Sequence, residues 1–123
     1  MAVSLIDKLR DVPLVFVDVE TTGASTDYGD RVMEIGIVRV EGGGVTCGGC
    51  VTEYQQLVDP GRRISAGVVA LTGITQSMVS GQPKFAQILS RVIELMSGAA
   101  VIGHNVRFDL SFLAGEFRRC RRP

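Results

Sequence analysis

Three carboxylates, Asp18, Glu20 and Asp109, are the residues of this sequence whose types and spacing could carry out chemistry. Asp18 and Glu20 lie two positions apart in the apolar run "FVDVE". In a β-strand, such side chains leave the same face, roughly 6.5 Å apart along the backbone. Two anions in partly apolar surroundings repel each other and raise one pKa, whereas a divalent cation would neutralise both. Carboxylate oxygens favour Mg²⁺ or Mn²⁺ over zinc as that cation.

Asp109 is the third acid, and its neighbours at helical spacing are apolar: Val106, Phe112 and Leu113. Its carboxylate is therefore expected on or beside a packed face, where leaving it unpaired would cost several kcal/mol. Beside Asp18 and Glu20, it would complete a site for two divalent metal ions about 3.5–4 Å apart, which grip the attacking and leaving oxygens of a phosphodiester. The alternative is that Asp18 ends a strand in solvent and Asp109 only complements the N-terminus of its helix.

An order of strands and helices must position these acids. Apolar, β-rich runs predict strands at residues 14–20, 32–40, 52–58 and 99–103. Helices are predicted from a Ser65 cap to Gly73, from Pro83 to Gly98, and from an Asn105 cap onward. This β-β-β-α-α-β-α order predicts an α/β fold in one domain, residues 1–123, with helices on a mixed sheet. We expect strand 99–103 beside strand 14–20, which would bring Asp109 towards the other two acids.

Composition and charge exclude several classes of protein. The formal net charge of the 123 residues is +0, so the whole molecule is not a generic polyanion binder. A cluster of four arginines is either a solvated helix end or a basic edge that attracts phosphate: Arg118, Arg119, Arg121 and Arg122. No apolar run approaches the ~20 residues of a membrane span. The charged first ten residues do not resemble a secretory signal, so we expect a cytoplasmic protein without membrane contact.

The three cysteines do not form a closed disulfide framework. Cys47 and Cys50 make a C-x-x-C pair in a glycine-rich turn, and only Cys120 and His104 could complete a zinc site with them. Two thiols kept reduced in the cytosol are the simpler interpretation, and the zinc site is the alternative.

Three segments in this order resemble the motifs of one family: "FVDVETTG" (16–23), "LTGIT" (71–75) and "HNVRFDL" (104–110). They are similar to the DEDD exonuclease superfamily, most of all to the proofreading epsilon subunit of bacterial DNA polymerase III and its free-standing relatives. The similarity runs from about Leu14 to the end of the sequence. It implies an RNase H-like fold, two divalent metal ions (Mg²⁺ or Mn²⁺), and metal-dependent removal of nucleotides from a 3′ end of DNA in proofreading or repair.

The same resemblance assigns roles to residues. Asp18, Glu20 and Asp109 correspond to catalytic metal ligands. The residues that it implies for substrate binding are Thr21, Thr22, Gly23, Leu71, Thr72, Asn105 and Phe108. The threonines and the glycine would line the terminal nucleotide, and Leu71 would press against the last base. Each position also has a purely structural interpretation, as a strand-ending turn, a helix end or core packing.

One family motif does not occur in these 123 residues. It is a histidine followed five positions later by a fourth metal-binding aspartate, where the histidine is the general base. His104 is the single histidine, and in the family this position precedes the second acid and is not the base. Losing a general base costs about 10²–10⁴ in rate, so we expect this chain to be weak or inactive. The alternative is a non-catalytic module that binds nucleic acid or a polymerase subunit.

The missing motif also has a consequence for the fold. In an RNase H-like domain a fifth strand would pair with strand 99–103, followed by further helices. A domain truncated before them would leave the apolar edge of strand 99–103 unprotected, which favours self-association. The choice between DNA and RNA stays open, because no residue here recognisably reads a 2′-hydroxyl.

Overall fold

The computed structural model describes residues 11–42 and 50–121. A four-stranded sheet forms its centre, made of β1 (Leu14–Thr21), β2 (Val32–Val40), β3 (Val51–Leu57) and β4 (Ala100–Ile102), in the order β3-β2-β1-β4. β1 pairs antiparallel with β2 and parallel with β4. The predicted mixed sheet and the predicted neighbourhood of the first and last strands are therefore confirmed, and β2 has the predicted bounds.

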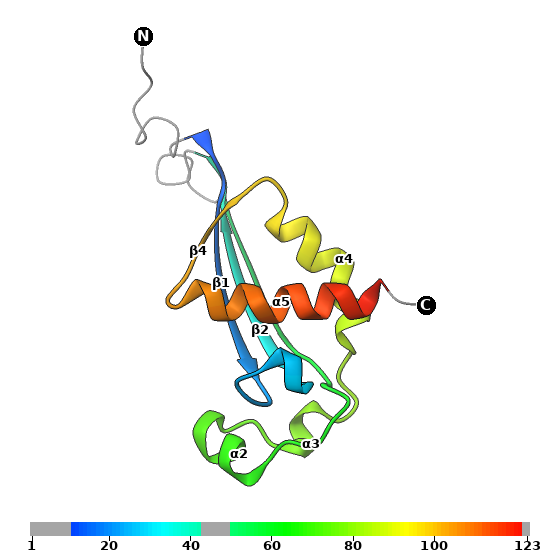
Figure 1. Cartoon of the computed structure of the whole chain (residues 1–123). Helices are drawn as coiled ribbons and strands as arrows, with labels where there is room; N and C mark the ends of the chain where they lie inside the picture. The colour runs from blue at the N-terminus through cyan, green and yellow to red at the C-terminus, as the bar shows by residue number, and fades with distance from the viewer. Residues whose placement is uncertain (1–10, 43–49, 122–123) are drawn as a thin grey trace.

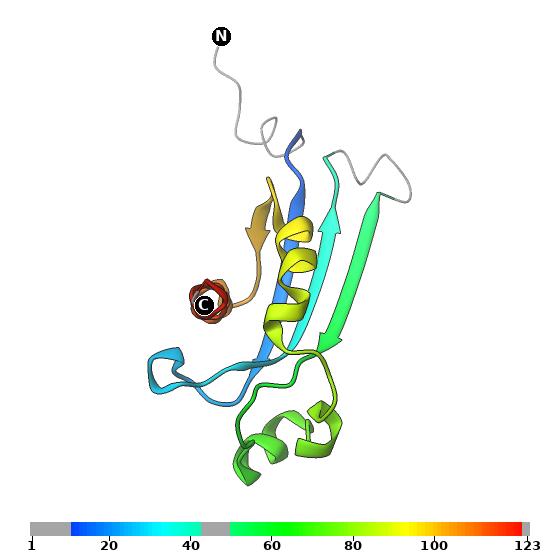
Figure 2. The same cartoon turned by 90° about the vertical axis from the view of Figure 1, so that its right-hand side faces the viewer.

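The remaining elements are η1 (Thr26–Tyr28), α2 (Ala66–Thr72), α3 (Gln76–Val79), α4 (Phe85–Met96) and α5 (Val106–Cys120). Helix α4 runs alongside the strands, and α5 crosses their direction close to β4 (Figures 1 and 2). The two short helices α2 and α3 lie together beyond the ends of the strands (Figure 1).

The main core lies between the sheet and the helices α4 and α5. Alternate β1 residues Val15, Val17 and Val19 are buried, whereas Phe16 and Asp18 between them are exposed. The helical partners of the buried valines are Phe85, Ile88, Val92, Leu95, Phe112 and Leu113. Because successive side chains of a strand alternate between its two faces, packing the valines leaves Asp18 on the open face of the sheet.

A second, smaller cluster holds α2 and α3. Its buried members are Met33, Ile64, Ile74 and Val79. The predicted limits of α2 are confirmed, because Ser65 Oγ accepts a hydrogen bond from Val68 N at 3.3 Å and Gly73 ends the helix with a φ of +76°. Helix α3 was not predicted, because its four residues are too short for a periodic pattern.

Several predicted boundaries differ from the structure. Strand β1 extends to Thr21, and β3 lies one residue earlier than predicted, at Val51–Leu57. Helix α4 begins at Phe85, because Lys84 is extended and donates its main-chain N–H to Gln87 Oε1 at 2.8 Å. Asn105 precedes α5 but does not cap it with its side chain; its φ of 55° is left-handed, whereas capping side chains normally sit on extended backbone. The strand expected at 99–103 shortens to Ala100–Ile102.

Among the described residues, β4 is an outermost strand of the sheet, as predicted, and its three residues pair with β1. Within 11–42 and 50–121, no helix has the length and apolarity needed to cross a membrane.

Candidate active site

Asp18 and Glu20 stand on the open face of β1. The β2 residue paired with Asp18 is Gly36, which has no side chain, so the carboxylate of Asp18 is exposed. Glu20 is half-buried and pairs directly with Glu34. The two acids of the first motif thus share one face, and a further acid from β2 borders them.

Asp109 reaches β1 from α5. The β1–β4 pairing ends at Phe16 and Ile102, so the Val19 N–H lies beyond the end of β4. That N–H donates a hydrogen bond to Asp109 Oδ1 at 3.2 Å. Asp109 is buried, with 4% of its surface exposed. The short strand therefore leaves a gap along β1, and the third acid fills it.

Burial and mutual repulsion act on these acids. Burial raises the pKa of Glu20, and the charges of Asp18, Glu34 and Asp109 raise it further. Burial also raises the pKa of Asp109; the Val19 N–H counteracts this rise, and the charge of Asp18 adds to it. The carboxylates are thus close enough to disfavour one another's ionised form.

The donor chemistry fits a hard divalent cation, because carboxylate oxygens are what Mg²⁺ and Mn²⁺ prefer and a cation would relieve the repulsion. As the side chains stand in the described part of the chain, no three acidic, histidine or cysteine side chains converge closely enough to hold an ion. The alternative zinc site is wrong for His104 and Cys120 as joint ligands, since they lie at opposite ends of α5, which is roughly 22 Å long. Cys50 is disulfide-bonded, so the interpretation as a reduced thiol is wrong for it. Cys47 lies outside the described residues.

The Thr21–Gly23 segment forms a tight turn whose hydroxyls are already used. Thr21 Oγ1 donates to the Gly23 carbonyl at 2.7 Å, and Thr22 Oγ1 donates to Asp30 Oδ1 at 3.1 Å. Asp30 Oδ2 also accepts from Ser25 N at 3.1 Å. A Cβ on Gly23 would lie 2.3 Å from Asp30 Oδ2, so the turn closes around this carboxylate. Asp30 is a residue that the sequence reasoning missed.

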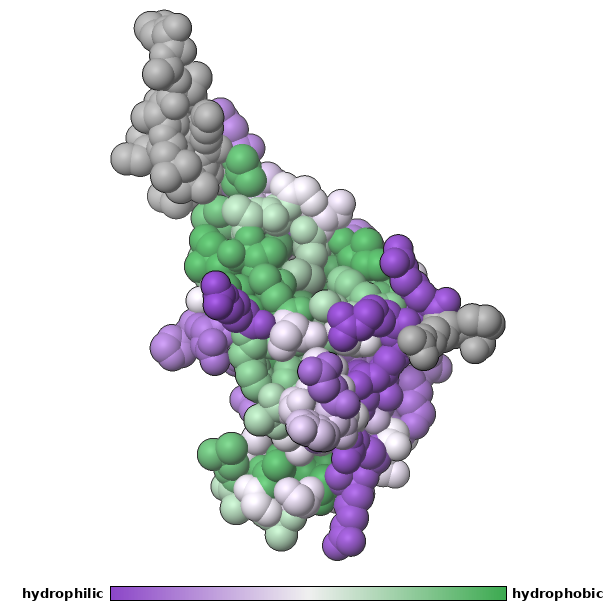
Figure 3. All heavy atoms as spheres, viewed as in Figure 1, coloured by the Kyte–Doolittle hydropathy of each residue, from purple (hydrophilic) through white to green (hydrophobic). Residues whose placement is uncertain are grey.

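Leu71 and Thr72, at the end of α2, differ in whether their side chains are free to contact a ligand. Leu71 is 85% exposed and belongs to neither buried cluster. Figure 3 shows hydrophobic surface, in green, over α2. The Thr72 hydroxyl donates to the Val68 carbonyl at 2.8 Å and accepts from Ile74 N at 3.2 Å. Leu71 is thus free to meet a ligand, whereas the Thr72 side chain closes its own helix.

Asn105 and Phe108 lie at the start of α5. Asn105 is exposed. Phe108 is half-buried and packs on Phe112, with ring centroids 4.9 Å apart. At the other end of α5, Arg119 Nη2 donates to the Thr26 carbonyl at 3.1 Å, so part of the arginine cluster is used within the fold.

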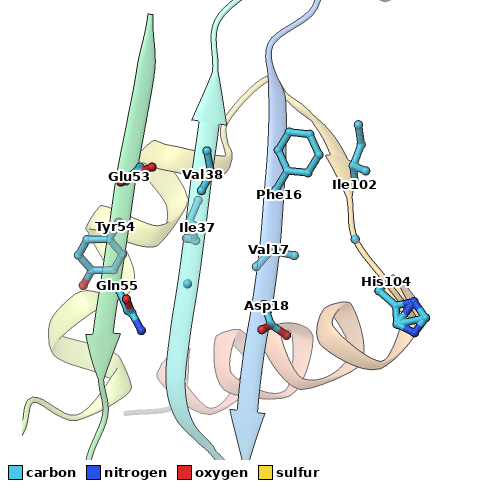
Figure 4. A pocket seen from close by; sticks show the side chains of 12 residues that line it. Phe16, Val17, Asp18, Ile37, Val38, Glu53, Tyr54, Gln55, Ile102 and His104 are labelled. Carbon is cyan, nitrogen blue, oxygen red and sulfur yellow. The ribbon is translucent and has the colours of Figure 1, made fainter. Parts of the chain in front are cut away.

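An open groove of about 860 Å³ crosses the open face of the sheet. Its residues are Phe16, Val17, Asp18, Gly36, Ile37, Val38, Glu53, Tyr54, Gln55, Ile102, Gly103 and His104. Figure 4 shows Asp18 and His104 towards one end, with the apolar Phe16, Val38 and Ile102 beyond them. The single histidine thus shares a groove with the first acid.

Glu34 was also missed by the sequence reasoning. The alternation in "VMEIGIVRV" places it on the face opposite the buried Met33 and Ile35, but periodicity alone does not reveal which β1 residue it meets. Its Oε2 accepts a hydrogen bond from Gln55 Nε2 at 3.3 Å.

Known proteins resemble this chain in sequence and in fold. Residues 15–123 match the model of the exonuclease family named RNase T. The chain belongs to the RNase T exonuclease family. It is thereby a member of the DEDD 3′–5′ exonuclease superfamily, as the three motifs predicted, and by family it is a hydrolase. Enzymes of this superfamily use two divalent metal ions.

Two curated relatives of this exonuclease chain are similar over most of its length. The 3′–5′ exonuclease DinG of Bacillus subtilis is 34% identical over 105 residues, which cover 85% of this chain and 11% of DinG. The PolC-type DNA polymerase III of Latilactobacillus sakei is 38% identical over 111 residues, covering 90% of this chain and 7% of the polymerase. The chain thus spans about a tenth of the length of these relatives.

Solved structures confirm the RNase H-like exonuclease fold. Exonuclease I in a complex with SSB-Ct superimposes with a TM-score of 0.74 at 23% identity, covering 89% of this chain and 24% of that one. The nuclease domain of 3′hExo, a DEDDh family member bound to rAMP, gives a TM-score of 0.69 at 22% identity, covering 90% of this chain and 60% of that one.

Proposed function

We propose that this chain contributes the metal-binding half of a 3′–5′ exonuclease site that hydrolyses phosphodiesters at the 3′ end of DNA. The observation that supports this most is the hydrogen bond from Val19 N to Asp109. This bond holds Asp109 of α5 beside Asp18 and Glu20 of β1, although Asp109 lies about 90 positions later in the sequence.

In this proposal Asp18, Glu20 and Asp109 hold two divalent ions, Mg²⁺ or Mn²⁺. When bound, such ions activate water and stabilise the attacking and leaving oxygens of the scissile phosphate. Asp109 contributes its second oxygen, Oδ2, because Oδ1 already accepts from Val19 N. The raised pKa values of Glu20 and Asp109 show that their ionised forms are disfavoured, and a bound cation would stabilise those forms.

The substrate is positioned by residues on both sides of the acids. The Thr21–Gly23 turn offers main-chain groups to the terminal sugar and phosphate, since its hydroxyls are bonded internally. Exposed Leu71 presses on the last base, with Thr72 as its support. Asn105 and Phe108, at the start of α5, lie beside the bound nucleic-acid strand. A single-stranded 3′ end of DNA is the substrate we propose from the relatives, and RNA is the alternative to test.

A polypeptide of these 123 residues alone is expected to cut slowly. It supplies three of the four acids of the superfamily, and its one histidine, His104, is exposed in the groove that Asp18 also lines, at the start of the second motif instead of after it. A general base contributes about 10²–10⁴ in rate. A longer polypeptide that supplies the histidine and the fourth aspartate should recover that factor.

Isothermal titration with MnCl₂ and digestion of 3′-labelled single-stranded DNA test the proposal. The chain should bind Mn²⁺, Asp18→Asn should lose that binding, and the matched groove variant Glu53→Gln should keep it. Absence of Mn²⁺ uptake by the unaltered chain would refute the metal site. Mn²⁺ and oligonucleotide binding without cleavage, even in the longer polypeptide, would instead identify a non-catalytic binding module.

Two kinds of protein partner are proposed, a second copy of this chain and a DNA polymerase subunit. The outer edge of β4 is proposed as a self-association site, because an unpaired apolar edge recruits another strand. A DNA polymerase subunit is the other proposed partner, from the PolC-type relatives. Light scattering at rising concentration tests the first: a monomer at every concentration would exclude it.

A further inference from the structure

Glu116 of α5 is a wholly buried carboxylate for which the proposed chemistry has no use, with 0% of its surface exposed. Its two oxygens accept from Arg31 Nε and Nη2 at 2.7 Å each. Oε1 also accepts from Val32 N at 3.2 Å. Replacing a buried ion pair by apolar residues of similar volume is often neutral or stabilising. Fold stability alone therefore does not account for a charge at this position.

Glu116 and Asp109 form one stripe on α5. They are seven residues apart, which is about two helical turns, or roughly 10.5 Å along the helix axis. Both carboxylates accept hydrogen bonds from main-chain N–H groups of the sheet: Asp109 from Val19 in β1 and Glu116 from Val32 in β2. Two such main-chain anchors on one stripe prevent the helix from sliding or rotating against the strands.

Arg31 extends this anchoring to the substrate turn. Its main-chain N–H donates to Thr22 Oγ1 at 3.0 Å, and its carbonyl accepts from Thr22 N at 2.9 Å. Its side chain meanwhile holds Glu116. The helix also approaches η1 closely, since a Cβ on Gly115 would lie 2.3 Å from Thr26 Oγ1. The helix that carries Asp109 and the turn that begins at Thr21 are therefore connected through the Arg31–Glu116 ion pair. The hydrogen bond from Arg119 Nη2 to the Thr26 carbonyl also joins α5 to η1.

We infer that Glu116 is a positioning residue of the proposed site. Its bonds to Arg31 and Val32 fix the setting of α5, and that setting places Asp109 beside the acids of β1. The same bonds hold the Thr22 turn in register with the helix. The inference rests on the proposed function, because it assigns Glu116 an effect on the metal ligand Asp109.

The experiment compares Glu116→Gln and the apolar double variant Arg31→Met/Glu116→Leu with the matched control Glu94→Gln, whose glutamate makes an exposed ion pair with Arg91 on α4. Two quantities are measured: hydrogen exchange of the Val19 amide in EDTA, and Mn²⁺ affinity by titration. We expect both variants to lose protection at Val19 and to bind Mn²⁺ roughly tenfold more weakly, as supporting residues of metal sites do. The control should match the unaltered chain.

The apolar double variant separates positioning from folding, because it should stay folded without the ion pair. Its melting temperature should be lower than that of the unaltered chain, because the buried Val32 N–H loses its acceptor. Unaltered Val19 protection in that variant would overturn the inference, and so would its failure to fold, since the pair would then serve stability. If the unaltered chain binds no Mn²⁺, the proposed function fails on its own; the Val19 exchange rates in EDTA still decide whether Glu116 sets the position of Asp109.

Discussion

The carboxylate of Asp109 accepts a hydrogen bond from the main-chain N–H of Val19, 90 positions earlier in the sequence, at 3.2 Å. Val19 lies between Asp18 and Glu20 in β1, and its side chain is buried among the core valines. One contact therefore ties the last helix to the strand position that separates the other two acids. The hydrogen bond to Val19 and the negative charge of Asp109 can be tested separately.

Replacing Asp109 separates the hydrogen bond from the charge. Asp109→Asn keeps an oxygen for the Val19 N–H and removes a repelled charge, so stability at neutral pH should hold or rise while Mn²⁺ binding is lost. Asp109→Leu leaves the buried N–H unpaired and should cost about 1–3 kcal/mol in free energy of unfolding. Urea denaturation and Mn²⁺ titration measure the two effects. An Asn variant that binds Mn²⁺ normally would remove Asp109 from the metal site.

Glu20 should make stability depend on pH. Its pKa in the folded protein is raised above 4.5, so the folded state takes up a proton more readily than the unfolded state. The stability that comes from this proton uptake is fully present below the ordinary pKa of a glutamate and is lost as the pH rises through the raised pKa of Glu20. Glu20→Gln should therefore raise the melting temperature in EDTA at about pH 7 but not at about pH 4.

The matched control for Glu20 is Glu53→Gln, on the exposed face of β3 and outside the acids that raise the pKa of Glu20. It should leave the difference between the two pH values unchanged. A Glu20→Gln variant with the same gain at both pH values would show that burial and repulsion among the acids do not raise the pKa of Glu20.

Gly23→Ala should disrupt the turn that follows β1. The added Cβ would lie 2.3–2.6 Å from the Asp30 carboxylate, and relieving that overlap should cost about 1–3 kcal/mol. Gly67→Ala is the control, because Gly67 lies in α2 with nothing within 4 Å of an added Cβ; it should gain about 0.5–1 kcal/mol. Denaturation of both variants decides, and a neutral Gly23→Ala would show that the Asp30 turn adapts freely.

Leu71→Ala tests the exposed apolar contact of α2. Since Leu71 is 85% exposed, the melting temperature should change little, whereas binding of a 3′-labelled oligonucleotide should weaken roughly five- to tenfold through lost apolar burial. Fluorescence anisotropy with an Asp18→Asn background avoids digestion. The control Ile93→Ala removes a half-exposed apolar side chain from α4 and should leave oligonucleotide binding unaltered. Equal affinities in both variants would argue against a base contact at Leu71.

Local patterns in the sequence were sufficient to predict the four strands, the helices α2, α4 and α5, and the face on which each acid lies. The alternation in 14–20 predicts that Asp18 and Glu20 share the face opposite the valines, and helical spacing predicts that Asp109 lies on the packed side of α5. Both predictions agree with the exposures of these residues. The predicted side-chain cap by Asn105 is wrong although the residue does precede α5, because its backbone is left-handed where the chain turns from β4 into α5.

The sequence by itself determined the order of the four strands and of α2, α4 and α5, and the faces of the three acids, because period-two and period-3.6 patterns are local properties. Its three motifs also indicated the family. Only the tertiary structure decided which residues meet: Glu20 with Glu34, Gly23 with Asp30, Asp109 with Val19, and Glu116 with Arg31. Those pairings depend on strand register and helix setting, which a periodic pattern constrains to a face but not to a partner.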